Sequence, residues 1–205
     1  MPYYPFGTPT NCRVIVDGQS LNVYGASPWP DRVDRGQAMI VANQAISGKG
    51  WFELVNSLTP RLSSVMDQSS RGVVLVMLGG SADIWSDHTG AQAYTDEVTY
   101  VTNVKALATA RSLGIRIVGT TTTPATLFTT AENTELLNLN TAVRNDASAA
   151  FDVKVDLWSD PRLNNPNDTT YYADGIHPTN NGIVAITELM RPGILTCMRQ
   201  LGASV

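Results

Sequence analysis

The chain has 205 residues, a length typical of one domain, and a protein of this size buries roughly 70% of the surface of its unfolded form. Its 43% hydrophobic and 16% charged residues exclude a disordered chain. The net charge of -4 comes with scattered Lys and Arg residues, so nucleic acid is not an expected partner. No stretch reaches the ~18 apolar residues of a membrane-spanning helix.

The start of the chain, MPYYPFGTPTNCR, lacks the charged start and apolar core of a secretion signal. This favours a cytoplasmic location, or a virion-associated or extracellular one reached by a non-classical route. Cys12 and Cys197 lie near opposite ends of the sequence and form either one disulfide or two buried thiols. The missing signal favours the thiols. The two Cys and two His residues share no metal-ligand spacing, so no metal is expected.

In chain order, short β-branched and apolar runs alternate with segments whose apolar residues recur every three or four positions. The runs predict strands at 13–17, 39–42, 73–78, 115–120 and 153–158, and the segments predict helices at 91–112, 131–149 and 181–199. Polar, turn-rich stretches at 119–130 and 159–173 are expected to be loops. This alternation predicts a single α/β domain over residues 1–205, a three-layer α/β/α sandwich with a five-stranded parallel sheet of the flavodoxin-like kind.

The reactive crevice of such a sheet lies beyond the carboxyl ends of its strands, where two segments carry candidate catalytic groups. Ser20 follows the first strand within DGQSLN, where its hydroxyl can act as a nucleophile and its N–H can face an oxyanion. In DGIHP, His177 can act as the base and Asp174 can supply the carboxylate that orients it. Taken singly, a turn serine, a capping aspartate and a surface or core histidine explain the same residues.

Glycine-rich turns follow the second and third predicted strands, in AISGKG and LGGSAD. A glycine N–H at a strand end can point at an oxyanion without side-chain obstruction, and Gly48 is the natural donor. Glycine turns alone carry little information, because strand-to-helix connections often use them.

The segments DGQSL, NQAISG, LGGSA and DGIHP, in this order, resemble the four sequence blocks of the SGNH, or GDSL-like, hydrolase superfamily. The resemblance spans about residues 13–178. It implies the SGNH hydrolase fold and a serine esterase that needs no cofactor, with Ser20 as nucleophile, His177 as base and Asp174 as its orienting partner. It also implies an oxyanion hole that includes the N–H groups of Ser20 and Gly48.

Two of the four blocks depart from the family pattern. Gln19 replaces the usual Asp of the first block, a change also familiar in sugar-acetyl esterases of related type. The third block lacks the Asn of the oxyanion hole: an ungapped alignment puts Ser81 there, and a shift by one residue puts Ala82 there and keeps Asp83. We favour Ser81, because a hydroxyl can donate a hydrogen bond and an alanine cannot.

Trp51, Trp85 and Trp158 each follow a strand-end segment and are candidates, with Gln19, for binding substrate. They can form a platform for a sugar ring or walls for an acyl chain, and core or rim packing explains them equally well. The substrate is predicted to be a small-molecule or polysaccharide ester, with O-acetylated carbohydrate first and a short-chain ester or thioester second. A non-catalytic carbohydrate-binding or viral-tail module with a decayed site is the remaining alternative. The oligomeric state is not predicted.

Overall fold

The computed structural model describes residues 12–34, 39–67, 72–203 and 205. Its centre is one fully parallel sheet with the strand order β2-β1-β3-β4-β5. The strands are β1 (Cys12–Gly18), β2 (Ile40–Asn43), β3 (Gly72–Leu78), β4 (Gly114–Thr120) and β5 (Val153–Val155). The chain leaves β1 toward β2 on one side and returns to β3 on the other, which creates a switch point at the carboxyl ends of β1 and β3.

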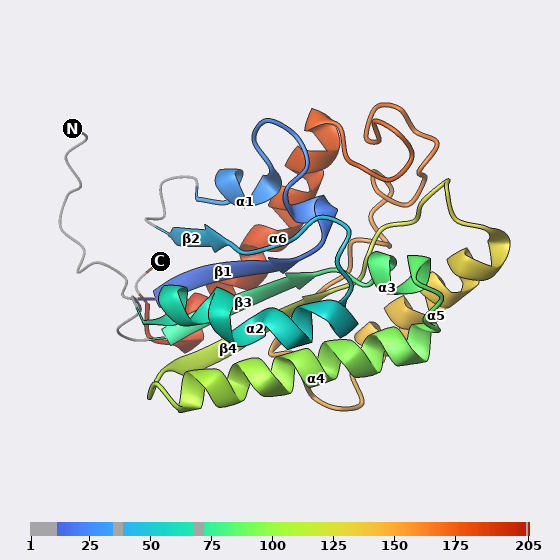
Figure 1. The fold of residues 1–205 in the computed structure, drawn as a ribbon. Coiled ribbons are helices and arrows are strands. Elements are labelled where there is room, and N and C mark those ends of the chain that lie inside the picture. The colour runs from blue at the N-terminus through green and yellow to red at the C-terminus, as the bar shows by residue number, and fades with distance from the viewer. Residues whose placement is uncertain (1–11, 35–38, 68–71, 204) are drawn as a thin grey trace.

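Helices cover both faces of the sheet, as Figure 1 shows with α2 and α4 on the viewer's side and α6 behind. The helices are α1 (Trp29–Arg32), α2 (Trp51–Met66), α3 (Ser81–Trp85), α4 (Gly90–Thr109), α5 (Thr130–Asn145) and α6 (Asn180–Gln200), with a 3-10 turn at Ser20–Asn22. Two hydrophobic cores lie between these layers, one under α2, α4 and α5 and the other under α1 and α6. The predicted three-layer α/β/α fold is confirmed.

The second crossover helix, α2, is absent from the sequence-based prediction. Its buried residues Trp51, Leu54, Leu58, Leu62 and Val65 recur every three or four positions, the spacing that turns one helix face to the sheet. Pro60, a residue that disfavours helices, lies inside α2 without ending it.

The last helix, α6, continues through Pro192-Gly193 and ends at Gln200. A Cβ on Gly193 would lie 3.2 Å from the side chains of Val153 and Val155. The glycine therefore lets α6 pack closely on the sheet.

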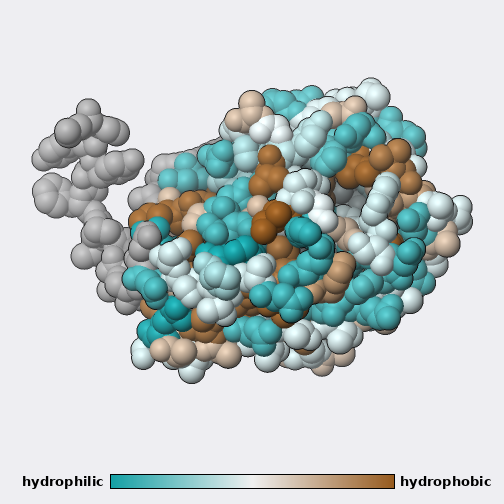
Figure 2. All heavy atoms as spheres, in the orientation of Figure 1, coloured by the Kyte–Doolittle hydropathy of each residue, from teal (hydrophilic) through white to brown (hydrophobic). Residues whose placement is uncertain are grey.

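Cys12 and Cys197 are separate buried thiols, as the sequence favoured. Burial raises the pKa of the Cys197 thiol to about 12, so this group stays protonated and unreactive at neutral pH. Figure 2 shows hydrophobic residues as separate patches among hydrophilic ones on one face of the molecule. No helix in the described part of the chain has the length and apolar character needed to cross a membrane.

Candidate active site

The turn that carries Ser20 depends on a glycine at the end of β1. Gly18 has φ of +132°, and a Cβ there would lie 2.0 Å from the backbone oxygen of Leu78 at the end of β3. Only glycine allows this backbone conformation and this close approach. The next residue, Gln19, donates its N–H to the same Leu78 oxygen at 3.3 Å, and the 3-10 turn begins at Ser20.

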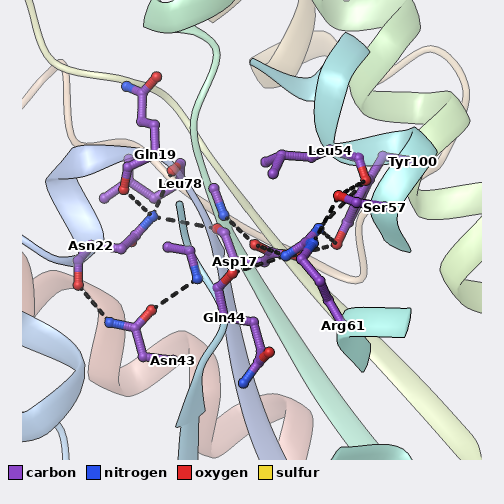
Figure 3. A network of polar contacts seen from close by, with 12 residues as sticks. Asp17, Gln19, Asn22, Asn43, Gln44, Leu54, Ser57, Arg61, Leu78 and Tyr100 are labelled. Carbon is purple, nitrogen blue, oxygen red and sulfur yellow. Dashed lines mark hydrogen bonds and ion pairs between the residues drawn. The ribbon is translucent and has the colours of Figure 1, made fainter. Parts of the chain in front are cut away.

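Asn22 secures the turn from the inside (Figure 3). Its buried Nδ2 donates to the backbone oxygen of Leu78 at 2.8 Å. Its Oδ1 accepts from Nε1 of Trp29 at 3.0 Å. The backbone oxygen of Asn22 accepts from Nδ2 of Asn43 at 2.7 Å. The side chain and the backbone oxygen of Asn22 thus tie the Ser20 turn to β3, α1 and the end of β2.

A buried ion pair fixes the other side of the turn (Figure 3). Nη1 of Arg61 on α2 lies 2.9 Å from both carboxylate oxygens of Asp17 and donates to the backbone oxygen of Gln44 at 2.9 Å. The Tyr100 hydroxyl on α4 donates to the same carboxylate. Burial raises the pKa of Asp17, and the Arg61 charge and the Tyr100 hydrogen bond oppose this rise. The end of β1 is therefore anchored to two helices.

Ser20, His177 and Asp174 form a continuous chain of polar contacts. Nε2 of His177 lies 3.0 Å from Oγ of Ser20, and its Nδ1 lies 2.8 Å from Oδ2 of Asp174. The other carboxylate oxygen of Asp174 accepts from the N–H groups of His177 at 2.7 Å and Ile176 at 3.0 Å. Although burial alone would raise the pKa of Asp174, these donors hold it below its usual value. The carboxylate is thus kept ionised beside the imidazole.

The 174–177 loop is itself held by neighbours. Gly175 adopts φ of +80°, and a Cβ there would overlap the Thr126 side chain. The N–H of Thr126 donates to the oxygen of Gly175 at 2.9 Å. Ala173 N–H donates to the oxygen of His177 at 2.8 Å and closes the loop.

Tyr24 is a site residue that the sequence reasoning missed. Its ring stacks on the His177 imidazole, with 4.2 Å between centroids and 9° between planes. Its position four residues after Ser20 is the only available signal, and aromatic residues near turns are too common for that spacing to be specific.

The candidate oxyanion donors face one pocket of about 240 Å³, which Ser20, Gly48 and Ser81 line together. Gly48 has φ of +74°, and a Cβ there would meet no atom within 4 Å, so its surroundings are open. Among the described residues, the backbone N–H groups of Ser20 and Gly48 donate to no protein acceptor. Both are therefore available to a bound oxyanion.

Gln19 links the first and third sequence blocks. Its Oε1 accepts from the N–H of Ala82 at 2.8 Å, so its Nε2 faces Ser81 and donates to Oγ. Gln19 also lines the pocket, but its amide is occupied by these two contacts. The substrate-binding role of Gln19 therefore stays a prediction, and its side chain contacts Ser81.

In the third block, Ser81 and Ala82 both line the pocket. Ser81 begins α3 at the pocket, whereas Asp83 is fully buried and accepts from the N–H groups of Trp51 at 3.0 Å and Phe52 at 3.3 Å. Burial raises the pKa of Asp83 to about 6, and these two donors oppose the rise. Asp83 thus caps α2 and does not enter the pocket.

The three tryptophans have different environments. Trp85 is 56% exposed and lines the pocket with the apolar side chains of Phe128 and Ile176. Trp51 is 1% exposed and packs over Gly79, so its expected place in the cleft is wrong and core packing explains it. Trp158 lines a different depression.

Asp83, His88 and Asp96 form the one group in the described ranges whose potential metal-ligand atoms lie within 4.8 Å of one another. Asp83 is engaged at the N-terminus of α2, and Nδ1 of His88 lies 3.1 Å from Oδ2 of Asp96. The Phe52 ring also packs on the His88 ring, with 4.5 Å between their centroids. Each of the three residues thus has a partner within the protein.

Comparisons with known proteins identify the family and the fold of the chain. The family model of the GDSL-like Lipase/Acylhydrolase family matches residues 15–183. Among solved structures, a lipolytic protein of the G-D-S-L family from Veillonella parvula is 13% identical, with a TM-score of 0.68 over 86% of this chain and 94% of that chain. The lipase/acylhydrolase from Enterococcus faecalis is 18% identical, with a TM-score of 0.66 over 89% of this chain and 95% of its own.

A catalytic mutant of an acetylxylan esterase from Geobacillus stearothermophilus is 13% identical, with a TM-score of 0.66 over 89% of this chain and 93% of that chain. No protein with a curated description matches the sequence significantly. The structural likenesses show a shared fold, and the family match covers most of the chain, including the Ser20 turn and the 174–177 loop. The chain therefore belongs to the GDSL-like lipase/acylhydrolase family and is an ester hydrolase.

Proposed function

We propose that this chain is a serine esterase that cleaves carboxylic esters through an acyl-enzyme, most specifically O-acetyl groups on carbohydrate. The observation that carries the catalytic part is the contact chain from Ser20 through His177 to Asp174 at the wall of an open pocket. A serine hydroxyl is a weak nucleophile until a base removes its proton, and this arrangement supplies that base.

In the first step, Oγ of Ser20 attacks the ester carbonyl carbon while Nε2 of His177 takes the hydroxyl proton. Asp174 stabilises the resulting imidazolium through its 2.8 Å contact with Nδ1. The tetrahedral intermediate then collapses, the carbon–oxygen bond to the alcohol breaks, and Nε2 returns its proton to the departing alcohol. In the second step, His177 deprotonates a water that attacks the acyl-enzyme, which releases the acid and restores Ser20.

The oxyanion of each intermediate is proposed to accept hydrogen bonds from the N–H groups of Ser20 and Gly48 and from the Ser81 hydroxyl. The orientation of the Gln19 side-chain amide supports the Ser81 hydroxyl as the third donor. Because Nε2 of Gln19 donates to Oγ of Ser81, the Ser81 hydrogen must point to another acceptor. Ser81 lines the pocket, so its hydrogen is available to the oxyanion there.

Two features favour an acetylated sugar as substrate. The half-exposed ring of Trp85 at the pocket offers an aromatic face of the kind that sugar rings pack against. An acetylxylan esterase is also among the structures that share this fold. A short-chain ester or thioester is the second candidate, because Trp85, Phe128 and Ile176 give one side of the pocket an apolar surface that suits an acyl chain. The assembled contacts at Ser20 and His177 argue against a decayed, non-catalytic site.

Three measurements test the proposal. Fluorophosphonate is expected to label the folded wild type and not Ser20→Ala. A p-nitrophenyl ester series is expected to show highest kcat/KM at acetate, and acetylated xylan or other acetylated glycans are expected to release acetate. Absence of labelling in folded protein, or equal labelling of Ser20→Ala, would refute the serine mechanism. A kcat/KM that rises with acyl length would instead favour the second candidate.

A further inference from the structure

A second and larger depression, of about 530 Å³, lies beside the 174–177 loop. Its walls come from the 124–126 segment after β4, the first turns of α5, Trp158 after β5, and the 166–167 segment. Its volume falls in the range of small-molecule sites. None of the roles assigned above uses it.

The chemistry of the lining is uncharged and mixed. An aromatic ring and aliphatic surface come from Trp158 and Leu137, while hydroxyl and amide groups come from Thr130, Thr134 and Asn133. Nδ2 of Asn133 donates to the backbone oxygens of Phe128 at 3.0 Å and Thr129 at 3.1 Å, so its Oδ1 points away from them as an acceptor.

These groups match a neutral sugar ring better than other ligands. A sugar offers one apolar face to an aromatic ring and hydroxyls to amides and alcohols. A phosphate or an acidic glycan would call for a cation in the lining, and the lining contains none. A plain acyl chain would leave the hydroxyl and amide groups without partners.

The depression lies next to the 174–177 loop. Thr126, in its wall, donates its N–H to Gly175 at 2.9 Å, two residues before the proposed base. Two residues further on, Phe128 lines the catalytic pocket. Between them, Leu127 is 60% exposed. The 124–128 segment is therefore a shared wall, with one pocket on each side.

We propose that this depression is a second carbohydrate subsite, which binds a neutral sugar unit of an oligomeric or polymeric substrate while an acetylated unit occupies the pocket at Ser20. The inference rests on the proposed function, since it assigns that esterase to glycan chains in place of acetylated monosaccharides. The glycan would pass over the exposed side chain of Leu127, between the two pockets.

The test compares Leu137→Arg with Ile40→Arg. Both wild-type residues are 44% exposed, but Leu137 lines the depression and Ile40 lies on the edge strand β2. Trp158→Ala is a second subsite variant, checked for folding by its thermal unfolding. Initial rates are measured with p-nitrophenyl acetate, an acetylated monosaccharide and an acetylated xylo-oligosaccharide.

The wild type is expected to have a lower KM for the oligosaccharide than for the monosaccharide. Leu137→Arg and Trp158→Ala are expected to raise the oligosaccharide KM about tenfold or more. Leu137→Arg is expected to keep p-nitrophenyl acetate turnover within about twofold of wild type, and Ile40→Arg is expected to change neither quantity. Equal oligosaccharide KM values in wild type and Leu137→Arg would overturn the subsite.

A binding measurement separates this inference from the esterase proposal. Titration calorimetry with deacetylated xylo-oligosaccharide needs no catalysis, and binding is expected for wild type and Ser20→Ala but not for Leu137→Arg. Failure of the wild type to bind overturns the subsite even if the enzyme is active. Inactivity toward every ester, with binding retained, overturns the esterase proposal alone.

Discussion

The contact between Gln19 and Ser81 allows a test of the third oxyanion donor by reversing one hydrogen bond. In wild type, Nε2 of Gln19 donates to Ser81, and Oε1 accepts from Ala82 N–H at 2.8 Å. Gln19→Glu keeps the shape, but an ionised carboxylate only accepts hydrogen bonds. The Ser81 hydroxyl would then donate to residue 19 and turn its hydrogen away from the pocket.

The expected magnitude follows from the loss of one donor. Removing one oxyanion donor in a well-studied protease costs ~10²–10³ in kcat, about 2.7–4 kcal/mol. We expect Ser81→Ala to lower kcat by roughly 10²-fold, with little change in KM, because the bond strengthens only as the oxyanion forms. Gln19→Glu should cause a loss at least as large, since it also brings a negative charge near the oxyanion.

A double-mutant cycle on p-nitrophenyl acetate separates orientation from charge. In the Ser81→Ala background no hydroxyl remains to be turned, so Gln19→Glu should act through charge alone and cost less than in wild type. Ser86→Ala is the matched control, because Ser86 lines the same pocket at the far end of α3. Additive effects of the two substitutions, or a Ser81→Ala loss no larger than that of Ser86→Ala, would refute Ser81 as a donor.

Three further predictions concern positioning and stability. Tyr24→Phe should retain near-wild-type kcat and Tyr24→Ala should lose about tenfold, because only the ring stacks on His177; equal losses would show that the hydroxyl matters and not the stacking. Gly18→Ala should cost more than ~2 kcal/mol in a urea unfolding titration, since its Cβ would meet the Leu78 oxygen at 2.0 Å; unchanged stability would contradict the close approach. Burial raises the pKa of Asp83 to about 6 from 3.8, so between about pH 4 and pH 6 the folded chain binds the proton that the unfolded chain has lost. Stability should therefore fall as pH rises through this window, by at most about 3 kcal/mol from this group, and Asp83→Asn should remove that part of the slope; an unchanged slope would contradict the shift.

The strands and the two segments that carry Ser20 and His177 were recognisable because each depends on a short local pattern. A strand such as β3 shows itself as an unbroken apolar run, and its burial on both faces is the cause of that run. Parallel strands then bring their carboxyl ends to one edge of the sheet. This topology brings the segments that carry Ser20 and His177 to the same edge of the sheet, although 157 positions separate the two residues in the sequence.

The parts that were missed depend on contacts between distant side chains. Trp51 looked like a cleft residue because it follows a strand-end segment, yet it covers Gly79 and lies in the core. Sequence position does not reveal which way such a ring turns. Tyr24 was missed for the same reason, since its stacking depends on where the distant loop of His177 arrives.

The role of Gln19 shows why the departures in the first and third blocks belong together. The side-chain amide of an asparagine in the third block would carry its N–H donors in fixed directions. The Ser81 hydroxyl rotates freely and needs a partner to direct its hydrogen. Gln19 supplies that partner, and Ala82 N–H fixes which end of the amide faces Ser81. A hydroxyl directed by a buried amide can thus occupy the place of a side-chain amide. The missing asparagine alone weakens the case for a hydrolase. The contact between Gln19 and Ser81 supports the proposal that the pair holds one hydrogen toward the oxyanion.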